Sequence, residues 1–168
     1  MKKVAIGVDI GGTNTAIGVV DAEGNVMVKD NISTPSHGDI DRYIADLSAA
    51  IKELIKSVKL LNEDIEFLGI GIGAPNGNYY SGTIEYAPNL SFRGMVPFVE
   101  LLSKHFPDMK AVALTNDANA AALGEMIYGG AKGMKNFVMF TLGTGVGSGI
   151  VVNGDLVYGH DGFAGECG

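Results

Sequence analysis

The fold is decided by one stretch near the start of the chain, VAIGVDIGGTNTAIGVV (residues 4–20). Residues 4–8 form a β-branched, apolar run of the kind found in buried strands, and residues 15–20 resume it after a polar turn. A second turn, at residues 21–25, leads to a third strand over residues 26–32. Three strands joined by such short turns must be antiparallel neighbours.

From residue 39 onward, apolar residues recur at helical spacing and predict a helix over residues 39–59. Later patterns predict, in chain order, a strand, a small hairpin, a helix, a strand and an Ala-rich helix, at residues 67–73, 79–86, 97–105, 111–114 and 118–128. This β-β-β-α-β-α-β-α order is not the alternating βαβ pattern of a dinucleotide fold. It resembles the α/β, ribonuclease H-like lobe of actin-like ATPases and sugar kinases, with a mixed sheet.

Apolar runs at residues 136–142, 149–152 and 156–157 then predict the first strands of a second, similar lobe. We therefore expect one lobe over residues 1–117, followed by a linking helix and the incomplete start of a nucleotide-binding lobe over residues 118–168. Strands that lack covering helices leave free edges, which favour pairing with another copy of the chain.

Composition indicates a globular protein, because 46% of the 168 residues are apolar and 18% are charged. The net charge of −7 comes without a basic cluster, which argues against nucleic acid as a partner. The single Cys167 excludes an intramolecular disulfide and fits a reducing compartment. With no signal peptide and no apolar run near the roughly 18 residues of a membrane span, we expect a cytoplasmic protein without a membrane partner.

The turn at residues 9–14, DIGGTN, is a candidate phosphate site. Gly11 and Gly12 let main-chain N–H groups approach an anion closely, and Thr13 and Asn14 add side-chain donors. Asp9, at the end of the strand, is placed to hold a hydrated Mg²⁺ beside the phosphates. Taken alone, the motif fits a simple tight hairpin better.

A second glycine cluster, LGTGVGSG, occupies residues 142–149 between two apolar runs. It lacks the lysine of a P-loop and does not give G-x-G-x-x-G. Two interpretations stay open: a hairpin that presents Thr144 and Gly145 to a phosphate, or a glycine-rich strand with bulges. A similar turn begins each half of the chain. Two such turns at matching places are less expected by chance than either turn alone.

Two further segments carry candidate catalytic or binding groups. Asp117, beside Asn116, would meet the positive end of a helix dipole, which favours the ionised carboxylate that a phosphoryl-transfer base needs. Plain helix capping is the commoner role of an isolated Asn-Asp pair. Near the end, Glu166 follows two small residues, so its carboxylate could accept hydroxyl hydrogen bonds. His160 and Asp161 have no second pair at metal-ligand spacing and are expected to be solvated turn residues.

Together, in order and spacing, these segments resemble the ROK family of repressors, open-reading-frame proteins and sugar kinases. The resemblance rests on DIGGTN, the glycine cluster, NDANAAALGE (residues 116–125) and GFAGECG (residues 162–168). Intervening matches are GIGAP (residues 71–75) and APNL (residues 87–90), so it covers essentially the whole chain. Within the family the chain most resembles the bacterial ATP-dependent glucokinases. With the phosphate turn at residue 9, we expect no helix-turn-helix of the repressor branch.

The resemblance implies that Asp117 takes a proton from the 6-hydroxyl of glucose while ATP donates the phosphoryl group. The implied sugar ligands are Asn116, Asn89 and Glu166, with Gly73 and Ala74 shaping the pocket wall. The implied phosphate contacts are Gly11, Gly12, Thr13 and Asn14 from one lobe and Thr144 and Gly145 from the other, with Asp9 near Mg²⁺.

This chain departs from the family pattern, and the departures limit the activity that we expect of it. Its structural zinc site, the histidine after the last glycine, and the adenine pocket would lie beyond residue 168, so we expect the 168-residue chain alone to be inactive or nearly so. A homodimer, common in the family, stays open. Two alternatives also stay open: a kinase for another hexose, such as N-acetylmannosamine or fructose, and a non-catalytic sugar sensor. The presence of Asp9, Asp117 and both turns weighs against the sensor.

Overall fold

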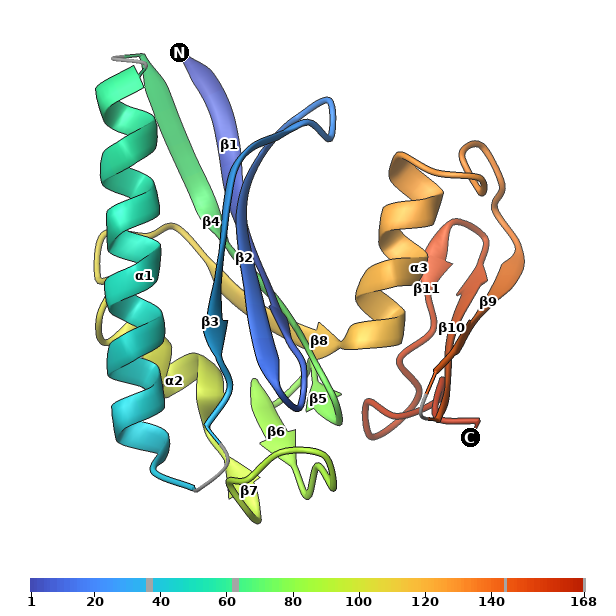
Figure 1. Ribbon diagram of the computed structural model, residues 1–168. Coiled ribbons are helices and arrows are strands. Elements are labelled where there is room, and N and C mark those ends of the chain that lie inside the picture. The colour runs from blue at the N-terminus through green and yellow to red at the C-terminus, as the bar shows by residue number, and fades with distance from the viewer. Residues whose placement is uncertain (36–37, 62–63, 144, 168) are drawn as a thin grey trace.

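A five-stranded mixed sheet lies at the centre of the computed structural model, which describes residues 1–35, 38–61, 64–143 and 145–167 (Figure 1). The strand order is β3-β2-β1-β4-β8. These strands are β1 (Lys2–Ile10), β2 (Asn14–Asp21), β3 (Val26–Ser33), β4 (Ile65–Ala74) and β8 (Val112–Asn116). Strands β1, β2 and β3 pair antiparallel, whereas β1, β4 and β8 run parallel. The predicted element order and the predicted antiparallel trio are confirmed.

One face of this sheet is covered by helix α1 (Ile40–Leu61), with α2 (Phe98–Ser103) beside it (Figure 1). Alternate residues of β1 are buried in the apolar core that the sheet and the two helices form. Leu47 and Ile51 of α1 are fully buried there. Burying one such side chain contributes roughly 1.5–3 kcal/mol, so this packing holds the lobe together.

A small second sheet stands where the sequence predicts one hairpin over residues 79–86. It comprises β5 (Gly77–Asn78), β6 (Thr83–Glu85) and β7 (Met95–Val96), in that order. Asn78 ends β5 because its Oδ1 accepts a hydrogen bond from Tyr80 N, 3.0 Å away, which turns the chain. Gly82, with φ of +67°, completes the turn. The hairpin therefore spans residues 77–85 instead of the predicted 79–86, and residues 79–82 form the turn between its strands.

The remaining elements are helix α3 (Asp117–Ile127) and a three-stranded sheet of β9 (Phe137–Leu142), β10 (Val146–Val152) and β11 (Asp155–Leu156). Strand β10 begins three residues before the predicted residue 149, because Val146 pairs with Leu142. Gly149 is needed for packing: a Cβ there would lie 2.5 Å from Ala122 Cβ of α3. Close contact between helix and strand thus explains part of the glycine cluster.

Replacing Gly149 by Ala is therefore expected to destabilise the protein by about 1–3 kcal/mol, the usual cost of overpacking. Gly124 of α3 is the matched control, because a Cβ there meets no heavy atom within 4 Å. Gly124→Ala should instead stabilise by about 0.8–1 kcal/mol through helix propensity. Urea unfolding of both variants measures the two effects, and equal changes would contradict the packing argument.

No loop separates the first sheet from α3, since β8 ends at Asn116 and α3 begins at Asp117. The division of the chain into residues 1–117 and 118–168 stays a prediction.

Within the described part of the chain, no helix is both long and apolar enough to cross a bilayer.

Candidate active site

Four predicted site residues meet at the carboxyl edge of the parallel strands. Asp9 of β1 pairs with Gly73 of β4, and the next residue of β4, Ala74, pairs with Asn116 of β8. In open parallel sheets, ligands bind outside this edge. Residues from three separate motifs are thus brought onto adjacent strand ends.

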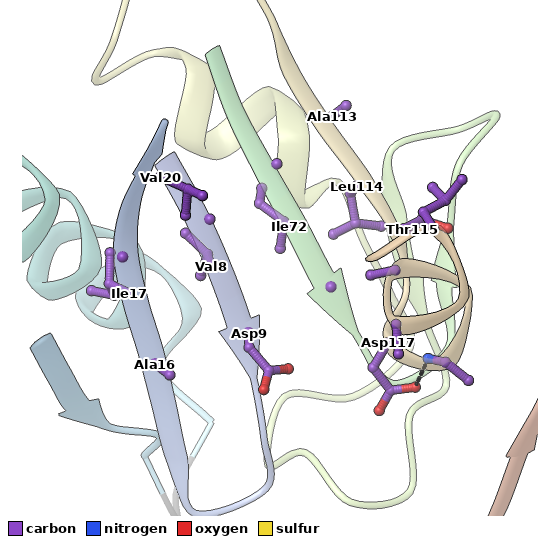
Figure 2. Close-up of a pocket in the computed structure, with 18 of the residues that line it drawn as sticks. Val8, Asp9, Ala16, Ile17, Val20, Ile72, Ala113, Leu114, Thr115 and Asp117 are labelled. Carbon is purple, nitrogen blue, oxygen red and sulfur yellow. Dashed lines mark hydrogen bonds between the residues drawn. The ribbon is translucent and has the colours of Figure 1, made fainter. Parts of the chain in front are cut away.

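Helix α3 begins at this edge, where Asn116 and Asp117 have different roles. Asn116 is the N-cap, and its Oδ1 accepts from Ala118 N at 2.8 Å and Asn119 N at 3.4 Å. The exposed Asp117 accepts from Ala118 N through Oδ1, at 2.7 Å (Figure 2). Its Oδ2 has no hydrogen-bond partner among the described residues. Because Asn116 does the capping, one oxygen of Asp117 is left for a ligand.

Asp9, Asp117 and Glu166 are three exposed carboxylates, and the charge of Asp117 acts on each of the other two. Asp9 and Asp117 lie on either side of the end of β4 in Figure 2. Partial burial and the negative charge of Asp117 raise the pKa of Asp9, and the same two causes raise the pKa of Glu166. The Asn116 amide donates to Glu166 Oε1. Among the ion pairs of the described residues, none involves these three carboxylates.

This charge suits a divalent cation, because uncompensated carboxylates repel a phosphate and oxygen donors are the ligands that Mg²⁺ prefers. No three potential metal-ligating side chains gather within the described ranges. Asp9 is the residue predicted to hold Mg²⁺.

The β1–β2 turn is exposed at residues 12–14 and contacts the loop that carries Asn89. Gly11 N donates to Asn14 O at 3.0 Å, so the Gly11 N–H is used within the turn. A Cβ on Gly12 would lie 2.8 Å from the main-chain oxygen of Asn89. The predicted phosphate turn and a predicted sugar ligand are thus immediate neighbours.

A buried cluster of three hydroxyl groups, which was not predicted from the sequence, stabilises this turn. Thr15 Oγ1 shares hydrogen bonds with Thr34 Oγ1 (2.9 Å) and with the Tyr43 hydroxyl (2.5 Å), and Thr34 N donates to Thr13 O (2.8 Å). Burial raises the pKa of Tyr43 to about 12, so its hydroxyl stays protonated. Two residues could have indicated this cluster, because Thr15 and Tyr43 carry hydroxyl groups at core positions of β2 and α1.

A cavity of about 860 Å³ lies between α3 and the face of the large sheet opposite α1. Such a volume is typical of small-molecule sites. Asp9, Gly73 and Asp117 line it, with Thr115 beside them. The rest of its wall is mainly small and apolar, including Ala16, Gly18, Val20, Ala113, Ala121 and Leu123.

The other predicted site residues lie outside this lining. Ala74 is fully buried, so only its backbone could shape a pocket wall. Gly145 accepts from Gly143 N at 3.0 Å in the tight β9–β10 hairpin, and Thr144 is outside the described residues. Asn89 and residues 12–14 are exposed at the β1–β2 end, and Glu166 is exposed beside Asn116.

Known proteins resemble this chain along nearly its whole length. The sequence model described as "ROK family" matches residues 5–168. The glucokinase of Streptomyces coelicolor is 38% identical over 98% of this chain and 49% of its own length. The xylose repressor of Caldicellulosiruptor bescii is 32% identical over 97% of this chain and 40% of its own length.

Among solved structures, a ROK family glucokinase from Streptomyces griseus, in complex with glucose and AMPPNP, has a TM-score of 0.77. It is 34% identical, over 97% of this chain and 49% of its own length. This likeness confirms the predicted ribonuclease H-like fold. The chain spans about half the length of the curated glucokinases that it matches. Because the family match extends over residues 5–168, the chain belongs to the ROK family.

Proposed function

We propose that this chain provides the sugar-binding part of an ATP-dependent kinase that transfers the γ-phosphoryl group to the 6-hydroxyl of glucose. One observation carries the proposal: the free carboxylate oxygen of Asp117 lies at the same sheet edge as Asp9, within one cavity. A base for the acceptor alcohol and a carboxylate for the phosphate-bound cation are the groups that phosphoryl transfer needs.

In the proposed reaction, Asp117 Oδ2 accepts the proton of the sugar 6-hydroxyl. The freed oxygen attacks the γ-phosphorus, a new phosphorus–oxygen bond forms, and the bond to the bridging oxygen of ADP breaks. Oδ1, held by Ala118 N, fixes the orientation of the carboxylate. Mg²⁺, when bound near Asp9, would neutralise charge on the phosphates.

The remaining predicted groups have positioning roles in this proposal. The Gly12 N–H, Thr13 and Asn14 would take the transferred phosphate from the first lobe, since the Gly11 N–H is already used. Thr144 and Gly145 would contact ATP from the second lobe. Asn89, Asn116 and Glu166 would hold sugar hydroxyls, with Gly73 and Ala74 at the pocket wall.

Two other functions remain as alternatives. Another hexose, such as N-acetylmannosamine or fructose, would use the same Asp117 chemistry. A non-catalytic sugar sensor is favoured by the likeness to a xylose repressor.

Thermal shift of the chain with glucose, N-acetylmannosamine, fructose and xylose separates the sugars, because a ligand at 100 times its Kd stabilises by about 2.7 kcal/mol. A coupled assay on a polypeptide with a complete second lobe separates kinase from sensor.

Replacing Glu166 by Gln tests the sugar site without breaking the local structure. The Gln Oε1 can still accept from Asn116, but it lacks the charge that strengthens hydrogen bonds from sugar hydroxyls. We expect glucose binding to weaken about 5-fold, because a hydrogen bond to a charged group contributes roughly 1 kcal/mol more than a neutral one. The melting temperature should hold or rise, because partial burial and the charge of Asp117 disfavour the ionised Glu166.

The same carboxylate predicts a pH dependence of sugar affinity. Its pKa is raised, so protonation on acidification begins at a higher pH than for an ordinary glutamate. Glucose affinity of the unmodified chain should therefore fall on acidification, starting at a higher pH than an ordinary glutamate would give, and Glu166→Gln should lack this component. Calorimetry measures both; identical affinities of the two proteins at neutral pH would rule out Glu166 as a sugar ligand.

A further inference from the structure

An aromatic stack joins the segment after β11 to the first lobe. Tyr158 lies flat against Tyr79, with ring centroids 4.4 Å apart and an interplanar angle of 11°. Tyr80 packs against the same ring at 5.9 Å, and its hydroxyl donates to Gly159 O at 2.9 Å. Tyr79 and Tyr80 belong to the loop after β5, so two segments nearly 80 residues apart in sequence meet here.

Asn78 holds the next part of the same segment. This residue is only 7% exposed, and its amide donates to Asp161 O at 2.9 Å and to Glu85 Oε1 at 3.0 Å. Gly162 lies so close that a Cβ would be 2.6 Å from Asn78 Oδ1. The segment is therefore fixed to the first lobe at successive positions, with specific hydrogen bonds as well as a stack.

The segment ends at the proposed sugar site. Ser148 Oγ donates to Gly165 O, and Asn116 donates to Glu166 Oε1. Glu166 is therefore held by anchors on both sides: the tyrosines a few residues earlier in the chain, and β10 and Asn116 beside it. Moving the first anchor would change where the carboxylate lies.

We propose that Tyr79, Tyr80 and Tyr158 form a tyrosine clasp between the two lobes that positions Glu166 and thereby sets sugar affinity. Tyr79 and Tyr158 also line the cavity that Asp9 and Asp117 line, but in this proposal the clasp residues act on the sugar through Glu166 and are therefore positioning residues. The affinity part rests on the proposed function, whereas the ordering of residues 157–167 by the clasp does not.

Tyr79→Ala is the test variant, since Tyr79 is 48% exposed in a loop and its removal leaves the core intact. Tyr79→Phe keeps the stack and should restore the original behaviour. Tyr128→Ala is the matched control: Tyr128 is 49% exposed, and its hydroxyl donates to Ala22 O at 3.4 Å, between the same two parts of the chain but away from the clasp.

Hydrogen exchange of the chain measures the ordering directly. In Tyr79→Ala, amides of residues 157–167 should exchange at least several-fold faster, with α1 and the large sheet unchanged. Tyr79→Phe and Tyr128→Ala should keep the original rates there. Unchanged exchange in Tyr79→Ala, or equal loss in Tyr79→Phe, would overturn the clasp.

Calorimetry with glucose measures the consequence for the site. Tyr79→Ala should weaken binding about 3- to 10-fold, the range expected from loss of an aromatic pair, and Tyr79→Phe should bind as the original chain does. In a catalytically complete protein, KM for the sugar should rise with kcat held. Faster exchange with unchanged affinity overturns the link to Glu166. If the unmodified protein does not bind glucose, both the proposed function and the proposed effect of the clasp on sugar affinity are wrong. The hydrogen-exchange result still tests whether the clasp orders residues 157–167.

Discussion

Asp117→Asn is expected to lower kcat of a protein that joins this chain to a complete nucleotide-binding lobe by ~10²–10⁴-fold, the usual contribution of a general base. Asn can still accept the hydrogen bond from Ala118 N through its Oδ1, so α3 should begin as before. It cannot take the proton of the sugar hydroxyl. KM for the sugar should change little, because the loss falls on the chemical step.

The control for Asp117→Asn is Asp108→Asn, which removes an exposed carboxylate from the turn between α2 and β8. It should leave both kcat and the melting temperature unchanged. A coupled assay for ADP, run with each variant at saturating glucose, supplies the comparison. Retention of the full rate by Asp117→Asn would show that another group deprotonates the alcohol. Absence of turnover in the unmodified protein, with sugar binding intact, would favour the sensor.

The parts of this site that could be predicted from sequence are those that depend on neighbours in the chain. Short turns force β1, β2 and β3 to pair antiparallel, and the Asn-Asp pair before an Ala-rich run predicts where α3 begins. The β5–β7 sheet was only partly predicted, because two-residue strands have no periodicity. The glycine cluster was ambiguous, since Gly149 is explained by the approach of Ala122 from α3, which no local pattern shows.

Contacts between distant segments account for what the sequence analysis missed. The hydroxyl cluster joins residues 19 and 28 positions apart, and the clasp joins residues 79 positions apart. A tyrosine or threonine in such a place has no local signature, because the same residue fits a solvated loop or a strand equally well. Only the tertiary arrangement distinguishes a supporting residue from a surface one.

Gly12→Ala is the second change expected to have a large effect, because it affects the turn and the Asn89 loop together. The new Cβ would lie 2.8 Å from Asn89 O, closer than real Cβ contacts, so one of the two segments must move. If the turn moves, the transferred phosphate is misplaced, and if the loop moves, the sugar is misplaced. Misplacement by about 1 Å can cost ~10²-fold in rate, so we expect kcat/KM to fall by at least that factor. The free energy of unfolding should fall by only about 1–3 kcal/mol.

The clash involves a backbone oxygen, and this makes the prediction specific. Adding Asn89→Ala to Gly12→Ala removes a side chain but leaves the main-chain oxygen in place, so the double variant should be no more resistant to urea unfolding than Gly12→Ala alone. Gly124→Ala, in the interior of α3, controls for the substitution itself and should keep full activity. Recovery of stability in the double variant would mean that the Asn89 side chain, and not its carbonyl, fixes the distance between the turn and the loop. In that case the phosphate and sugar positions would be coupled through a replaceable side chain, and the backbone would not impose a rigid spacing on the turn and the loop.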